Sequence, residues 1–368
     1  MSLRKNYNHS YMMATVRFLF FPAIFSFVFY LQSCDGEDPK PAGKYESGAV
    51  IVNEGGFGSA NGTLTYYDVS TGGVEQNIFR NAVGDFAGDV VQSITFSEDK
   101  GYVVINGDNK IEIVNGNTFE NLGTIADVGL DKPRYVEVIG DKAYISAWGP
   151  YGDGGFSLVD SYVLVVDLNN NTVIKKIETE EGTENLLYGG KYLFASNYNF
   201  GASNSVAVID PADNTLVKHI QLAPGPAGSV LDANGKLWVI CAGDFGSSNG
   251  RLFRINPVTL DVEGSVELNV NPDVDLGITP DKQELIYSTG KDVYKISISA
   301  TVAPASELFK AADVVYNYAL GVDPDTGNIW IADALNFTAE GRVYVYSNSG
   351  TLINSFTAGI GPTQLVFK

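Results

Sequence analysis

Short Gly-, Asn- and Ser-rich segments that each hold aromatic residues recur along the chain, and they are its best candidates for binding chemistry. An aromatic ring in such a setting offers a flat stacking surface at low entropic cost. That surface suits a planar ligand or a sugar, whereas in the alternative interpretation each Phe only fills a gap within the fold. The aromatic candidates are Phe57, Trp148, Tyr151, Phe156, Tyr198, Phe200, Phe245 and Phe337.

Side chains for acid–base, nucleophilic or metal chemistry are scarce. The two histidines are His9 and His219, so a Ser-His-Asp triad in a chain that has lost its N-terminus would depend on His219. Residues 246–250 match G-x-S-x-G, but they fall in a predicted hairpin loop rather than at a strand-to-helix elbow. Residues 323–327 resemble the start of a calcium loop, yet Ala334 stands where a Glu ligand is needed. We therefore expect no enzymatic activity, no bound metal and no cofactor.

The charge balance narrows the range of partners. The chain has 24 basic and 43 acidic side chains and a net charge of −19. A protein this acidic repels the phosphate backbone of nucleic acids. It is also repelled by an anionic lipid surface, so charge alone would not hold it on a membrane.

The N-terminal segment is typical of an export signal. A 14-residue apolar run over 18–31 follows Arg4, Lys5 and Arg17, and it is too short to span a bilayer. The run ends in Leu31-Gln32-Ser33-Cys34, which resembles a bacterial lipobox, and we expect lipidation of Cys34. An ordinary signal peptide with a chance Cys is the alternative. The sequence thus predicts a lipoprotein signal peptide over 1–33, an acidic and Pro-containing tether over 34–48, and one domain over 49–368.

Internal repeats predict the architecture of that domain. A pair of strands joined by a tight Asp/Gly/Lys turn recurs at intervals of 42 to 51 residues, and two further strands follow each pair. This spacing is typical of a four-stranded β-propeller blade. The six complete copies begin at Val91, Pro133, Glu184, Gly228, Val274 and Tyr318.

The two ends of the domain complete a seventh blade. Strands predicted over Ala49–Asn53, Thr63–Tyr67 and Val74–Phe79 have no inner strand before them, and the strand predicted over Thr363–Phe367 has nothing after it. Joining the two ends removes the free edges that an open sheet would expose. We therefore expect an all-β, monomeric seven-bladed propeller. Two separate β-sandwiches are the alternative, which the regular period disfavours.

In a propeller, the loops between second and third strands lie on the same face as the loops between blades. All the aromatic candidates fall in these loops, and the longest loop, 147–161, combines Trp148, Tyr151 and Phe156. The start of each inner strand should line the channel mouth on that face, as either a polar floor for a ligand or a water-filled lining. The aligned positions are Gln92, Arg134, Asn185, Ser229, Asp275, Ala319 and Thr363.

The second strands resemble the YVTN-type β-propeller repeat, with Tyr144-Ile145-Ser146-Ala147, Phe194-Ala195-Ser196-Asn197 and Trp330-Ile331-Ala332-Asp333 as the matching segments. Together with the lipobox and the acidic tether, residues 52–68 and 133–149 resemble Bacteroidetes surface propeller lipoproteins. The resemblance implies an outer-membrane lipoprotein that faces the cell exterior. Some members of that group capture cobalamin and pass it to a TonB-dependent transporter.

Three functions are consistent with these observations. The first is capture of a small ligand, with a corrinoid as the candidate that the resemblance implies and a TonB-dependent transporter as partner. The second is glycan binding or adhesion through the same aromatic loops. The third is a propeller hydrolase or lyase, which the scarcity of histidine disfavours.

Overall fold

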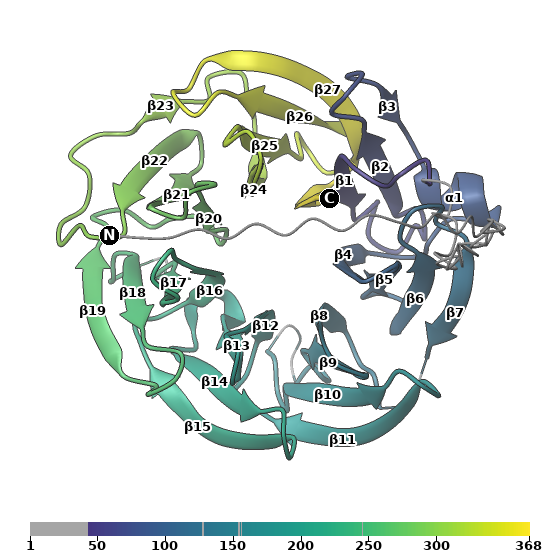
Figure 1. Cartoon of the computed structure of the whole chain (residues 1–368), viewed down its shortest axis with the longest axis horizontal. Coiled ribbons are helices and arrows are strands. Elements are labelled where there is room, and N and C mark those ends of the chain that lie inside the picture. The colour runs from purple at the N-terminus through teal and green to yellow at the C-terminus, as the bar shows by residue number, and fades with distance from the viewer. Residues whose placement is uncertain (1–42, 127–128, 154, 156, 245) are drawn as a thin grey trace, which may run out of the picture. The chain divides into compact units, whose positions relative to one another are not determined.

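The computed structural model describes residues 43–368, except 127–128, 154, 156 and 245. These residues form seven four-stranded antiparallel sheets, which are arranged in a ring as the blades of a β-propeller (Figure 1). We call the space enclosed by the inner strands the channel. The predicted fold class is confirmed. The predicted signal peptide, the lipidation site Cys34 and most of the tether lie outside the described residues. No helix in the described part of the chain is long and apolar enough to cross a membrane.

The blades follow one another in chain order, and within each blade the strands run from the channel outwards. Blade 1 holds β28 (Pro362–Phe367), β1 (Ala49–Asn53), β2 (Thr63–Tyr67) and β3 (Val74–Glu75). Blade 2 holds β4 (Val91–Ser97), β5 (Lys100–Ile105), β6 (Lys110–Asn115) and β7 (Asn121–Ile125). Blade 3 holds β8 (Pro133–Ile139), β9 (Lys142–Ala147), β10 (Tyr162–Asp167) and β11 (Thr172–Glu178). Blade 4 holds β12 (Thr183–Tyr188), β13 (Leu193–Asn197), β14 (Ser205–Asp210) and β15 (Thr215–Gln221).

The remaining three blades are built in the same way. Blade 5 holds β16 (Pro226–Leu231), β17 (Leu237–Cys241), β18 (Arg251–Ile255) and β19 (Val262–Glu267). Blade 6 holds β20 (Gly277–Ile278), β21 (Glu284–Thr289), β22 (Asp292–Ser297) and β23 (Phe309–Lys310). Blade 7 holds β24 (Asn317–Val322), β25 (Ile329–Asp333), β26 (Glu340–Tyr346) and β27 (Leu352–Ile360).

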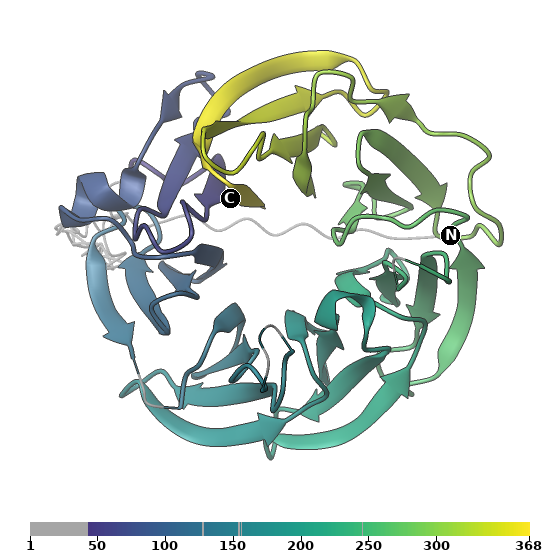
Figure 2. The same cartoon turned by 180° about the vertical axis from the view of Figure 1, so that it is seen from behind.

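The two ends of the domain close the ring, as the leftover strand predicts. β28 pairs antiparallel with β1, from Ala49 opposite Phe367 to Asn53 opposite Pro362. β28 also contacts the inner strands β24 and β4 on either side, so it fills the last position around the channel (Figure 2). Blade 1 is therefore formed by the two ends of the propeller domain.

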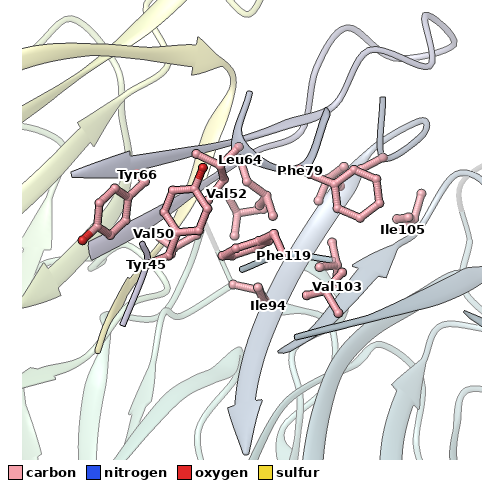
Figure 3. Packing of buried hydrophobic residues seen from close by; sticks show 14 residues of the cluster. Tyr45, Val50, Val52, Leu64, Tyr66, Phe79, Ile94, Val103, Ile105 and Phe119 are labelled. Carbon is pink, nitrogen blue, oxygen red and sulfur yellow. The ribbon is translucent and has the colours of Figure 1, made fainter. Parts of the chain in front are cut away.

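The core lies between neighbouring blades, because each sheet buries one face against the next. Between blades 1 and 2, Val50, Val52 and Leu64 pack against Ile94 and Val103 (Figure 3). The second strands are the most buried elements, and every residue of β13, β17 and β25 is buried. β17 ends in the free thiol of Cys241, and burial raises its pKa to about 12, which makes it unreactive.

One predicted strand is wrong over most of its length. The strand expected over Val74–Phe79 ends at Glu75, and a short helix, α1 (Ile78–Val83), follows it. Asn77 adopts a left-handed conformation with φ of 58°, which turns the chain out of the sheet. The turn brings Ile78 and Phe79 into the core between blades 1 and 2. Burial of these two side chains thus outweighs the local preference for a strand.

The two faces of the ring differ. The loop face carries the loops between second and third strands and those between blades, whereas the turn face carries the tight turns that follow the inner and third strands. The domain begins on the turn face, where the Tyr45 N–H donates to the carbonyl of Asn117, in the turn after β6. There the Lys368 ammonium donates to the carbonyls of Tyr45 and Gly116.

Candidate ligand site at the channel mouth

A bulge near the start of the inner strand decides which side chains reach the channel mouth. The pairing register shifts there in blades 1, 2, 3, 4, 5 and 7. An extra residue in one strand re-aims the side chains that follow it. We call the residues at the bulge the upper tier: Thr363, Gln92, Arg134, Glu184, Ala227 and Tyr318. Those at the next position form the lower tier: Gln364, Ser93, Tyr135, Asn185, Gly228 and Ala319. Asp275 of blade 6 precedes β20 and is counted with the lower tier, because its carboxylate, like the Gln364 amide oxygen, accepts an inner-strand N–H of the next blade.

Arg134 is the centre of a hydrogen-bonded network in the upper tier. Its Nε donates to Glu184 Oε2 at 2.9 Å, and its Nη1 donates to Gln92 Oε1. Only 14% of the Arg134 side chain and 11% of the Glu184 side chain are exposed, so this ion pair is largely desolvated. The three residues of the network, Gln92, Arg134 and Glu184, come from blades 2, 3 and 4. The network therefore links three blades at the channel mouth.

Trp148, directly after β9, closes over this ion pair. Its Nε1 donates to Glu184 Oε1 at 2.8 Å, while the Arg134 guanidinium carbon lies 3.9 Å from the centroid of its ring. Phe200 packs edge-on against the indole, with 5.5 Å between ring centroids. Trp148 is half-buried, so the predicted rim residue also covers the charged network beneath it.

A second group of polar and aromatic side chains lies across the channel, in blades 1 and 7. The Tyr318 hydroxyl lies 3.0 Å from both carboxylate oxygens of Glu54, to which it donates a hydrogen bond. Phe337 packs edge-on against Tyr318 and Tyr316, at 4.8 Å and 5.1 Å between ring centroids. The mouth is thus flanked on two sides by aromatic groups.

The channel mouth, where Glu54 lies beside the upper tier, holds two carboxyl groups and one guanidinium group. Burial raises the pKa of both Glu54 and Glu184, and the positive charge of Arg134 opposes the rise in each. One guanidinium thus faces two carboxylates. A ligand that donates hydrogen bonds or carries positive charge would relieve this imbalance.

The lower tier mainly joins one blade to the next. The Leu320 N–H donates to Asp275 Oδ2 at 2.8 Å, and the Ile94 N–H donates to Gln364 Oε1 at 2.8 Å. The inner edge of each sheet has backbone groups with no partner strand, and these side chains satisfy them. Asn185 accepts a hydrogen bond from the Ser229 hydroxyl.

The bulge therefore divides the predicted ring of channel residues between two levels. Gln92, Arg134 and Thr363 stand in the upper tier, whereas Asn185, Asp275 and Ala319 stand in the lower tier. Ser229 lies one position further along its strand. Three upper-tier residues, Glu184, Ala227 and Tyr318, were not predicted, and neither was Glu54, which bonds to Tyr318. The available signal for Glu184 and Tyr318 was a charged or aromatic residue at the second position of an otherwise mainly apolar inner strand.

The loop aromatics differ widely in exposure. Phe57 is 91% exposed, so it does not fill a gap over its blade, while Phe200 is 54% and Phe337 36% exposed. Tyr198 is half-buried beside Phe200, at 6.1 Å between ring centroids. Tyr151 is 42% exposed, and the Lys132 ammonium lies 4.6 Å from its ring centroid. Phe156 and Phe245 lie outside the described residues.

The weaker motifs occupy structural positions. Residues 246–250 follow Asp244, whose carboxylate accepts the N–H groups of Gly246, Ser247 and Ser248 in a loop between two strands. Asp323 accepts the N–H groups of Asp325 and Thr326 in a turn. His219 lies on the outer strand β15. In the described residues, no group of three His, Cys, Asp or Glu side chains is arranged to hold a metal ion.

Comparison with known proteins places the chain in a family. Residues 47–359 match the model of a domain of unknown function (DUF5074). The chain belongs to this family. The matched residues include strands of all seven blades and end before β28. No curated protein sequence matches the chain.

Solved structures resemble the chain in fold. A quinoprotein alcohol dehydrogenase-like protein from Bacteroides thetaiotaomicron is 14% identical and has a TM-score of 0.68, with 89% of this chain and 79% of that chain covered. Kuenenia stuttgartiensis hydrazine synthase is 16% identical, with a TM-score of 0.56 and coverage of 73% and 87%. The computationally designed Ika8 protein is 13% identical, with a TM-score of 0.57 and coverage of 89% and 93%. Identities this low show the fold alone.

Proposed function

We propose that this protein is a non-enzymatic receptor that captures a small ligand over the channel mouth on the loop face. The observation that carries the proposal is the pair of aromatic groups, around Trp148 and around Tyr318, that flank a buried network with an excess of carboxylate. A rigid ring of blades holds both groups, so little ordering entropy is lost on binding.

The ligand that fits best is a flat ring system edged with hydrogen-bond donors. Exposed rings such as Phe200 and Phe337 supply stacking surfaces, and the carboxylates of Glu54 and Glu184 accept hydrogen bonds from donors. A corrinoid has this chemistry, because a flat macrocycle carries amide side chains around its edge. The resemblance to surface propeller lipoproteins, some of which capture cobalamin, supports this choice.

A glycan is the second candidate. The apolar face of a sugar stacks on an aromatic ring, and its hydroxyl groups donate hydrogen bonds to carboxylates. The Phe57 side chain is 91% exposed, which favours this alternative. A ring that no other part of the domain covers can contact an extended ligand more easily than a compact one bound at the channel mouth.

Binding measurements on a panel of probes test both candidates. We expect cyanocobalamin or cobinamide to stabilise the protein against thermal unfolding, by about 2.7 kcal/mol at a hundredfold excess over the dissociation constant. Phe200→Ala and Trp148→Ala should each weaken binding by about tenfold or more in calorimetry, since a stacking anchor is worth about 2 kcal/mol.

His219→Ala, on the outer strand β15, is the matched control and should bind like the parent. If oligosaccharides bind instead, with the same sensitivity to Phe200→Ala, the glycan candidate replaces the corrinoid. Binding of either probe class that is unchanged in both aromatic variants would place the site elsewhere.

We further propose that Cys34 is lipidated, that the propeller is displayed on the outer membrane and that it delivers its ligand to a TonB-dependent transporter. Attachment on the turn face supports this, because the loop-face site then points away from the anchored end of the domain. Cys34→Ala should move the protein from the membrane to the soluble fraction and remove the lipid mass, while the melting temperature stays the same. Unchanged fractionation of this variant, with no loss of mass, would rule out the anchor.

A further inference from the structure

A cavity of about 370 Å³ lies mostly below the upper tier, of which Thr363 alone lines it among the described residues. Its volume falls within the range of small-molecule sites, at the lower end. The lower-tier residues Tyr135, Asn185, Asp275, Ala319 and Gln364 line its inner part. Thr279, Pro280 and Lys282 line its outer part and belong to the turn after β20, so the cavity extends towards the turn face.

The wall of this cavity is apolar on several sides. Ile278, Leu320, Val322 and Leu365 contribute aliphatic side chains, and Phe367 contributes an aromatic ring. Polar side chains, such as those of Asn185, Asp275 and Gln364, share the lining and can bind one polar group of a ligand, while the aliphatic side chains offer a contact surface. The cavity therefore suits a molecule with an apolar body.

Asp275 gives the cavity a single negative charge at its inner end. It is the acidic residue among the described residues that line the cavity, and its carboxylate accepts a hydrogen bond from the Leu320 N–H. No lysine or arginine in the described part of the chain forms an ion pair with it, and Lys282 stands exposed in the turn. The other titratable groups that act on it are Asp273, which is also negative, and Tyr135. A carboxylate in this setting is stabilised by a cation that binds beside it, and without one it takes up a proton more readily.

We propose that this lower cavity is a second binding site, which takes a small amphipathic amine from the turn face. The ammonium group binds the Asp275 carboxylate, and the apolar body lies against Leu320, Leu365 and Phe367. This site does not rest on the proposed function, because the ligand of the mouth binds on the other face, beyond the upper-tier network of Arg134, Glu184 and Gln92.

The test uses n-hexylamine as the probe, with 1-hexanol and hexanoate as matched neutral and anionic probes. In methyl-labelled protein at about pH 8, hexylamine should shift the NMR signals of Ile278, Leu320 and Leu365 saturably, whereas the other two probes should not. Burial raises the pKa of Asp275 to about 7, so binding should weaken by roughly tenfold from pH 8 to pH 6 as the carboxylate takes up a proton.

Asp275→Asn keeps an acceptor for the Leu320 N–H and should weaken hexylamine binding by about tenfold or more. Val230→Phe, which places a larger side chain in the cavity wall, should do the same by filling the space. Phe200→Ala, at the mouth, should bind hexylamine like the parent. Equal binding of the three probes, unchanged binding by Asp275→Asn, or no saturable shift of these methyl groups would overturn the proposal.

Discussion

Removal of residues 363–368 is expected to abolish cooperative unfolding of the domain and to cause aggregation. These residues make up nearly all of β28, which supplies the inner strand of blade 1 and pairs with β1 along its whole length. Without them, β1 presents an unpaired inner edge, and β24 and β4 lose the strand that lies between them. Unpaired edges of this kind are templates for association between chains.

Thermal unfolding followed by circular dichroism, together with light scattering, measures this effect. The matched control is Lys368→Met, which keeps the strand but removes the ammonium bonds to Tyr45 and Gly116. The control should unfold cooperatively, with a loss of about 1–3 kcal/mol from the unpaired carbonyls. A truncated protein that melts like the full chain would show that blade 1 does not depend on its closing strand.

Replacement of Arg134 by Met should lower the free energy of unfolding by about 3–5 kcal/mol at neutral pH, because it leaves a buried carboxylate without its cation. Glu184 would keep only the Trp148 Nε1–H bond, and Gln92 would lose its donor. Arg134 also lowers the pKa of Glu54. In the variant, the Glu54 carboxyl group would therefore take up a proton more readily. Chemical denaturation at neutral pH measures the loss.

Lys132→Met is the matched control for the loss of a positive charge, because Lys132 pairs with Asp131 on the more exposed rim. This replacement should lower the free energy of unfolding by less than about 1 kcal/mol. The double variant Arg134→Met/Glu184→Gln should recover part of the loss, since it removes the uncompensated charge as well. If Arg134→Met costs no more than Lys132→Met, the network at the channel mouth does not stabilise the fold.

The fold could be predicted almost completely from the sequence. Each blade buries its second strand on both faces, so segments such as Leu237–Cys241 appear as continuous apolar runs at a regular interval. The unmatched strands at the two ends fixed the number of blades and the way in which the ring closes. The error at Val74–Phe79 arose because Val, Ile and Phe favour a strand locally, while the core between blades 1 and 2 accepted Ile78 and Phe79 from a helix.

The candidate site was predicted only in outline. Trp148 and Arg134 were placed correctly on the loop face. Trp148 directly follows the second strand of its blade and Arg134 lies at the start of the inner strand, and both of these strand ends lie on that face. Their roles were not predicted, since Glu184, which pairs with both, lies in the next blade. The register of the inner strands was not predicted either. A bulge adds one residue to a strand, and the apolar pattern of the residues after it does not show where that residue stands.

The sequence by itself therefore determined the seven blades, their closure and the face that carries the aromatic loops. Those features follow from the period of apolar strands and turns, which is a local property of the chain. Only the tertiary structure decided that Arg134 meets Glu184 and Gln92, that Tyr318 meets Glu54, and that Asp275 faces a cavity. These contacts join residues from different blades, and their geometry exists only once the ring has closed and brought the inner strands around one channel.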